Sequence, residues 1–126
     1  MIALGKVIYS LLTTTGTTIY STVGKKVYPL VIPEGTQLPC IVYERNGDYE
    51  YSRDGQGIAT TAVDITVLSE DYSETIDIAE GVFNILNMYS GDNNSIHIFN
   101  INLTSVQETY AENAFIQKLT FEVKSI

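Results

Sequence analysis

The chain is poor in the residues that carry most enzyme chemistry: it has a single cysteine, a single histidine and no tryptophan. Cys40 alone can form neither an internal disulfide nor a cysteine-ligated zinc site, which fits a reducing compartment. His97 has no second histidine or cysteine at metal-ligand spacing, so a zinc site and a Ser-His-Asp triad both lack support. We predict structural or surface roles for both side chains, and we expect no cofactor, no metal and no enzymatic activity.

Basic residues are also scarce, because seven Lys and Arg stand against 15 Asp and Glu and give a formal net charge of −8. This balance argues against the phosphate-neutralising surface that nucleic-acid binding requires. No window approaches the roughly 18 apolar residues of a membrane span. The apolar segment Ile2–Leu12 contains Lys6 and leads into threonines without a cleavage pattern, so we predict no signal peptide. With 126 residues and 44% hydrophobic content, residues 1–126 are expected to form one domain.

Hydrophobic periodicity predicts two amphipathic helices. The first lies near Ala3–Leu12 and is ended by threonines and Gly16. The second begins at Asp71, which stands three residues before Glu74 in the spacing of a capping box. Its inner half is predicted to hold Ile76, Ile78, Ala79, Val82, Phe83, Ile85 and Leu86. Its outer half is predicted to hold Asp77, Glu80, Gly81 and Asn84.

The remaining pattern predicts strands separated by polar turns. Between Val63 and Val67 we expect the apolar side chains to pack against an element that covers one face of the strand, while Asp64 and Thr66 face water. Pro29 confines the first strand to an edge or an end, and Tyr89–Ser95 is predicted to be a turn. The predicted strands are Val27–Tyr28, Cys40–Glu44, Ala62–Leu68, Ile96–Leu103, Ser105–Tyr110 and Ala114–Val123. This order indicates an α+β fold, a largely antiparallel β-sheet with two helices packed on one face and a long protruding β-hairpin loop.

That loop, the polar excursion Asn46–Gly57, is longer than the two to five residues that join antiparallel strands. Alternation places Tyr49, Tyr51 and Arg53 on one side of it, and Tyr and Arg are enriched at the energetic centres of protein interfaces. The alternative is that they pack back on the domain's own sheet. The nearby carboxylates are expected to be solvated rather than catalytic. The predicted protein-contact residues are Asp48, Tyr49, Tyr51, Arg53 and Asp54.

Several segments, in this order and spacing, give the chain its likeness to a known family. They are "IYSLL", "LPCIVYE", "AVDITVLSEDY", "SETIDIAEGVFNIL", "LTSVQETY" and "AFIQKLTFEVKS". The chain resembles the tail-completion or tail-terminator proteins of long, non-contractile-tailed phages and prophages, over nearly its whole length. None of these segments is a catalytic or ligand motif.

The resemblance implies a structural virion protein of the tail, assembled in the host cytoplasm without contact with a membrane. Six copies would form a homohexameric ring that caps the tail tube at its final length and joins it to the head–tail connector protein. DNA would pass through without specific binding, and negative charge in the channel would repel it. The excursion would reach roughly 20 Å toward the tube protein or a neighbouring subunit. Exposed strand edges near Val27 or Ser105–Tyr110 would supply contacts between copies.

Two other functions stay open at this stage. A head-completion or connector protein would also form rings without chemistry. A soluble small-ligand-binding module would use aromatic residues such as Tyr43, Tyr49 and Tyr51 to line a cleft, and a large apolar pocket would favour it. An enzyme is the weakest option, because no nucleophile–base pair or metal site is evident.

Overall fold

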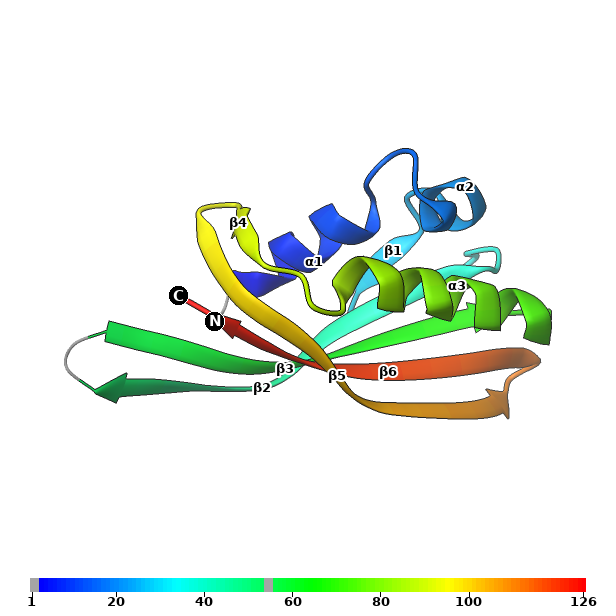
Figure 1. The fold of residues 1–126 in the computed structure, drawn as a ribbon. Helices are drawn as coiled ribbons and strands as arrows, with labels where there is room; N and C mark the ends of the chain where they lie inside the picture. The colour runs from blue at the N-terminus through cyan, green and yellow to red at the C-terminus, as the bar shows by residue number, and fades with distance from the viewer. Residues whose placement is uncertain (1–2, 54–55) are drawn as a thin grey trace.

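The computed structural model describes residues 3–53 and 56–126, with the side chains of residues 48–53, 56 and 57 left out. Its strands form one six-stranded sheet in the order β1-β2-β3-β6-β5-β4, in which β1 is parallel to β2 and the other pairs are antiparallel. The helices of the described residues lie on one side of this sheet (Figure 1). The α+β prediction is confirmed. The elements are α1 (Leu4–Leu12), α2 (Thr18–Val23), β1 (Val27–Pro29), β2 (Cys40–Arg53), β3 (Gln56–Ser69), α3 (Tyr72–Leu86), β4 (Gly91–Asn93), β5 (Ile96–Ala111) and β6 (Ala114–Ser125).

The start of α3 is set by the cap that the sequence predicts. The Asp71 carboxylate accepts a hydrogen bond from the backbone N–H of Glu74 at 3.2 Å. In a capping box the Glu side chain would return to the N–H of Asp71, but here Ser69 stands between them. Its hydroxyl accepts from the Asp71 N–H at 3.1 Å and donates to Glu74 Oε1 at 2.6 Å. The last residue of β3 therefore fixes the first turn of the helix.

Helix α2 is an element that hydrophobic periodicity did not predict. It is six residues long and buries only Ile19 and Val23, too few to produce a clear periodic pattern. Its caps are the available signal: the Thr17 side chain accepts from the N–H of Tyr20, and Gly24 ends the helix at a φ of +66°. A Thr N-cap and a positive-φ glycine are common helix boundaries.

The core lies between the helices and the covered face of the sheet. Helix α1 presents Leu4, Val7, Ile8 and Leu12 to it, and every one of these side chains is buried. On β6, Leu119, Phe121 and Val123 alternate toward the same core, as their spacing predicts. Phe121 is fully buried and belongs to the central part of the sheet, because β6 pairs with both β3 and β5.

Gly81 was predicted to lie on the polar half of α3, and the structure corrects this. A Cβ placed on Gly81 would lie 3.0 Å from Cγ1 of Ile19, a distance shorter than ordinary van der Waals contact. The glycine thus lets α2 approach α3 closely. Helical periodicity could not reveal this contact, because the covering element was itself unrecognised.

Replacing Gly81 with Val should loosen the contact between α2 and α3. The added branches overlap Ile19, and we expect a loss of about 1–2 kcal/mol in the free energy of unfolding, as for other overpacked sites. Urea denaturation measures it. Asn84→Val is the matched control, because it puts the same side chain on an exposed position of the same helix and should change stability by less than about 0.5 kcal/mol. Equal effects at the two positions would contradict this account.

The C-terminal strands also differ in part from the prediction. Ile96–Leu103 and Ser105–Tyr110 form one strand, β5, whose pairing with β6 shifts between Leu103 and Ser105. The irregularity explains why the alternation changes phase there. The predicted turn Tyr89–Ser95 contains the short strand β4, which pairs with the start of β5.

The single cysteine lies in the core and the single histidine at the surface, which agrees with the structural or surface roles predicted for them. Cys40 is fully buried, and burial raises the pKa of its thiol against a smaller opposing effect of the nearby Lys26 charge. His97 is half exposed; its Nδ1 lies 2.7 Å from Oδ1 of Asp92, and its ring meets that of Phe99 edge to face. A buried thiol with a raised pKa is a poor nucleophile.

Candidate interaction surfaces

The excursion predicted at Asn46–Gly57 is largely a paired ribbon of β2 and β3. Strands β2 and β3 pair continuously from Asp48–Thr61 to Arg53–Gln56, so the excursion belongs to the two strands. Because β6 pairs with β3 only as far as Ala59, the paired residues 51–53 of β2 and 56–58 of β3 extend past the end of β6 by roughly 10 Å. This hairpin tip projects from one end of the sheet (Figure 1).

Four of the five predicted contact residues lie on this ribbon. Asp48 pairs with Thr61 at its base, and Tyr49, Tyr51 and Arg53 follow along β2. Their side chains lie outside the described part of the structure, as does the whole of Asp54. Their contact role stays a prediction.

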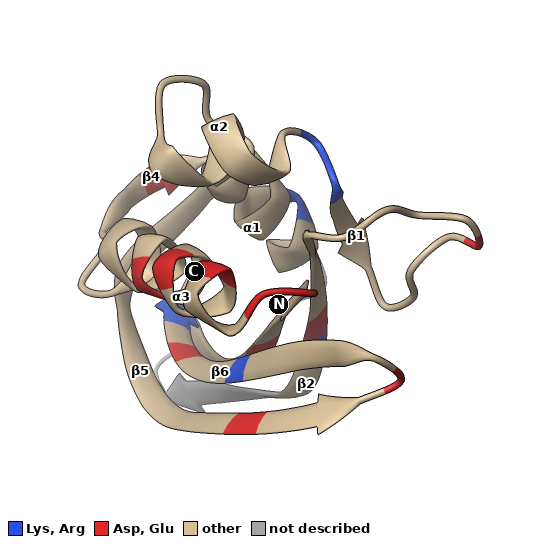
Figure 2. Ribbon diagram, turned by 90° about the vertical axis from the view of Figure 1, so that its right-hand side faces the viewer, with Lys and Arg blue, Asp and Glu red and all other residues tan. Residues whose placement is uncertain are grey.

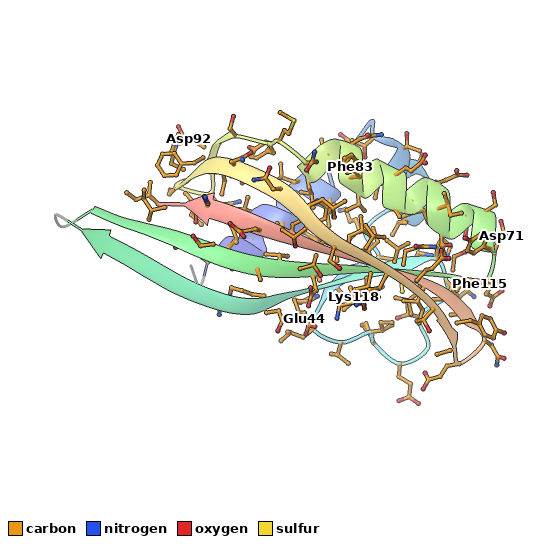
Figure 3. The ribbon with its side chains drawn as sticks, turned by 60° about the horizontal axis from the view of Figure 1, so that its bottom comes forward. Glu44, Asp71, Phe83, Asp92, Phe115 and Lys118 are labelled. Atoms are coloured by element: carbon orange, nitrogen blue, oxygen red, sulfur yellow. The ribbon has the colours of Figure 1, made fainter. Side chains whose placement is uncertain are left out.

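The base of the hairpin is anchored by a polar cluster that alternation did not predict. Asp64 was expected to face water, yet it is only 1% exposed. Its carboxylate accepts from Asn46 Nδ2 at 2.8 Å and Thr120 Oγ1 at 2.7 Å, and Lys118 Nζ lies 3.7 Å away. Figure 3 shows Lys118 on the side of the sheet away from α3. Alternation correctly assigns Asp64 to that face, but it cannot show that neighbouring polar side chains cover it.

Asn46 adjoins an irregularity in the strand pairing. The register of β2 against β3 shifts between Arg45 and Asp48, and Gly47 adopts a φ of +140°. A bulge of this kind bends the strand and increases its twist. The Asn46–Asp64 hydrogen bond ties that bend to β3, so the direction of the ribbon is set by the sheet.

An apolar groove of about 320 Å³ runs between α3 and strands β5 and β6. Val106, in its wall, exposes 54% of its surface. The groove is open rather than an enclosed ligand cavity. Its apolar lining consists of Ile76, Ala79 and Phe83 from α3 with Leu103, Val106 and Leu119 from the sheet.

A hydrogen-bonded glutamate stands near one end of the apolar groove. Glu108 Oε2 accepts from Gln117 Nε2, which also lines the groove, and from the Tyr72 hydroxyl, each at 3.0 Å. The hydrogen bond from Gln117 has the larger effect in lowering the pKa of Glu108, and the hydrogen bond from Tyr72 lowers it further. The hydrogen bond to the Glu108 carboxylate raises the pKa of Tyr72. The rings of Tyr72 and Tyr110 both meet Phe115, near the start of α3 (Figure 3).

A second apolar feature lies at the opposite edge of the sheet. Leu30 and Val31, which we call the apolar knob, each expose 71% of their surface. The Val31 N–H donates to the carbonyl of Pro29 at 2.7 Å, which closes a three-residue turn around Leu30 at a φ of +66°. This conformation is unfavourable for a bulky side chain. Since such strain persists only where surrounding structure imposes it, the turn is a functional candidate.

Charge is distributed unevenly between these two sides. Asp71, Glu74, Asp77 and Glu80 all lie at or on α3. Lys25 and Lys26, two of the seven basic residues, come directly before β1. Figure 2 shows the acidic helix on one side and the basic segment beside β1 on the other. The sheet order puts β1 and β5 at opposite sides of the molecule.

Within residues 3–53 and 56–126, no three His, Cys, Asp or Glu side chains come together as a possible metal site. Over the same residues, no helix has the length and apolar character needed to cross a membrane.

Comparison with known proteins shows a similarity of fold. A scan against protein-family models finds no match, and a search of curated proteins finds none. Among solved structures, the fold matches a chain of the virion of a native gene transfer agent (GTA) particle, with a TM-score of 0.75 and 14% sequence identity. The match covers 94% of this chain and 90% of that chain. The α+β architecture described above is therefore one that also occurs in a virion particle.

Proposed function

We propose that this chain is a structural virion protein that forms a ring, caps a phage tail tube at its final length and joins the tail to the head connector. The observation that carries the proposal is the fold match to a virion-particle chain over nearly the full length of both chains. The order and spacing of the sequence segments that resemble tail-terminator proteins support it independently.

Three features of the surface suit such a role. A ring needs two different complementary patches on each subunit, and the apolar knob and the apolar groove lie at opposite edges of the sheet. The hairpin tip extends past β6 and offers a surface for the tube. A net charge of −8 per copy disfavours retention of passing DNA.

Electron microscopy of tails tests the proposal. Tube protein from the same genome is polymerised, purified chain is added, and further tube protein is supplied. We expect density at one end of each tube and arrested growth at that end. Ovalbumin, an unrelated acidic protein, is the control and should leave growth unchanged. Binding to the connector ring without binding to tube ends would identify a head-completion protein instead.

A further inference from the structure

We propose that the open side of strand β5 at residues 104–111, which we call the β5 edge, binds an extended, basic segment of another protein as a further strand of the sheet. This inference goes beyond the proposed function and does not depend on a ring. Strand β5 pairs with β6 along almost its whole length, but on its other side β4 covers only residues 96–98. From residue 104 onward, no other strand of the described chain lies on that side.

Hydrogen bonds mark where the covered part of β5 ends. The Ile101 carbonyl accepts from the Met88 N–H at 2.7 Å, and the Leu103 N–H donates to Oδ1 of Asn87 at 3.0 Å. The pairing with β6 then shifts between Leu103 and Ser105. Past this shift every residue of the β5 edge is exposed, whereas buried residues recur along the strand before it.

The β5 edge lacks two of the features that keep strand edges from pairing with other chains. It contains no Lys and no Pro, residue types that natural edges use for this protection. Val106 and Tyr110 expose 54% and 58% of their surface. The one charged residue, Glu108, accepts hydrogen bonds from Gln117 and from the Tyr72 hydroxyl. A long open edge with exposed apolar side chains and a single charge is suited to the addition of a strand.

The chemistry of a strand edge selects an extended backbone as the occupant. Backbone N–H and C=O groups recur along the edge in a regular row, which another extended segment matches. Because residues two apart share one face of a strand, Val106, Glu108 and Tyr110 lie on the same face. Apolar side chains at alternate positions of the added strand would pair with Val106 and Tyr110.

Charge makes a basic segment the favoured occupant. Neither α3 nor β5 contains Lys or Arg, and Figure 2 shows acidic positions on both elements. Lys118 pairs with Gln107 of the β5 edge, but it faces away from α3 (Figure 3) and lies 3.7 Å from the Asp64 carboxylate. Lys or Arg on the added strand would therefore meet carboxylates without competing bases. The acidic residues of α3, β5 and the following turn are Glu74, Asp77, Glu80, Glu108 and Glu112.

A second copy of this chain is a poor occupant. On the opposite edge of the sheet, the Val27 N–H already donates to the Lys25 carbonyl at 2.8 Å, and Pro29 has no N–H. The part of β2 that β1 leaves open is interrupted by the irregularity at Gly47. Pairing two β5 edges would bring one Glu108 toward the other, between copies that each carry a charge of −8. The occupant therefore comes from another protein.

Peptide binding to the full-length chain tests the inference. The probe is a labelled synthetic peptide of alternating Val and Lys, as long as the β5 edge. Fluorescence anisotropy should show saturable binding, and hydrogen exchange should slow at residues 104–111. The same peptide methylated on its backbone nitrogens keeps its side chains and charge but loses its donors, so it should bind about tenfold more weakly or worse. A peptide of alternating Val and Glu should not bind.

Val106→Lys places a like charge at the β5 edge and should weaken binding of the Val-Lys peptide by about tenfold or more. Val31→Lys is the matched control, because it makes the same replacement at a 71% exposed position beside the opposite edge of the sheet. Since distant exposed charges are screened, the control should change the affinity by less than about twofold.

Three results would overturn the inference: no binding of the Val-Lys peptide, equal binding of its methylated form, or equal effects of the two lysine substitutions. Sedimentation of the chain alone checks the other occupant. If the chain dimerises and Val106→Lys abolishes the dimer, the β5 edge belongs to a contact between copies and the inference is wrong. None of these measurements involves tail tubes, so a failure to cap tubes would contradict the proposed function alone.

Discussion

A chain in which Tyr51–Ile58 is replaced by Asn-Gly should fold normally and fail to cap tail tubes. The cut follows the strand register: Glu50 pairs with Ala59, and β6 pairs with β3 up to that same residue. The shortened hairpin keeps every pair that belongs to the sheet, closed by a two-residue turn that suits antiparallel strands. The variant loses Tyr51 and Arg53, which are residue types that dominate binding energy at interfaces.

The affinity for tube ends should fall by at least on the order of 30-fold, which corresponds to the loss of one strong contact residue. Labelled tubes titrated with each protein provide the measurement. A variant with Asn-Gly at positions 54–55, which changes only Asp54 because residue 55 is already Gly, is the control, since it keeps Tyr51 and Arg53, and it should bind far more tightly than the shortened chain. Equal affinity for the shortened chain would exclude the hairpin tip as the tube contact.

The register also shows which deletion to avoid. Removing Asp48–Gln56 would take away the β2 partners of Ala59 and Thr61, both of which are buried. A loss of binding in that variant would not distinguish a missing contact from a damaged sheet. The shorter replacement removes this ambiguity.

Phe121→Ala should have the largest effect on stability. The side chain is fully buried in β6, the strand that β3 and β5 flank. Truncation removes buried apolar surface and leaves a cavity between the sheet and the helices. Such changes cost about 3–5 kcal/mol, a third or more of the total for many domains. Guanidinium denaturation followed by circular dichroism measures the loss.

Phe99→Ala is the matched control for this experiment. It removes the same side chain from β5, where 44% of the residue's surface is exposed and the ring meets only the edge of His97 among the ring contacts of the described residues. The expected cost is about 1 kcal/mol or less. A cost at Phe121 no larger than that at Phe99 would mean that the core is not centred on β6.

The elements with long, regular patterns were predictable from sequence. Helix α3 combines a capping residue, Asp71, with a continuous apolar face, and local physics determines both. Pro29 lacks the N–H that an inner strand must donate, which predicted an edge or an end; β1 is an edge strand and Pro29 is its last residue. Local sequence therefore carries the α+β class and most element boundaries.

The interaction surfaces were less predictable, because they depend on elements that are distant in sequence. The apolar groove joins Phe83 on α3 to Val106 on β5 and Leu119 on β6, and no local pattern encodes that meeting. Leu30 belongs to a short apolar stretch that gives no sign of its positive φ. The hairpin was recognisable as an excursion, but its pairing up to Arg53 and Gln56 was not.

The buried carboxylate of Asp64 has a consequence for the entropy of assembly. Its bond to Asn46 and the continuous pairing of β2 with β3 stiffen the hairpin where it leaves the sheet. A flexible arm would search many orientations and would lose that freedom on docking, at a cost of about 1–2 kcal/mol for each backbone residue that becomes ordered. A stiff arm has lost most of this freedom when the chain folds. Every copy in a ring would then point its arm along the same direction relative to the ring axis, so one docking geometry would serve all the copies together.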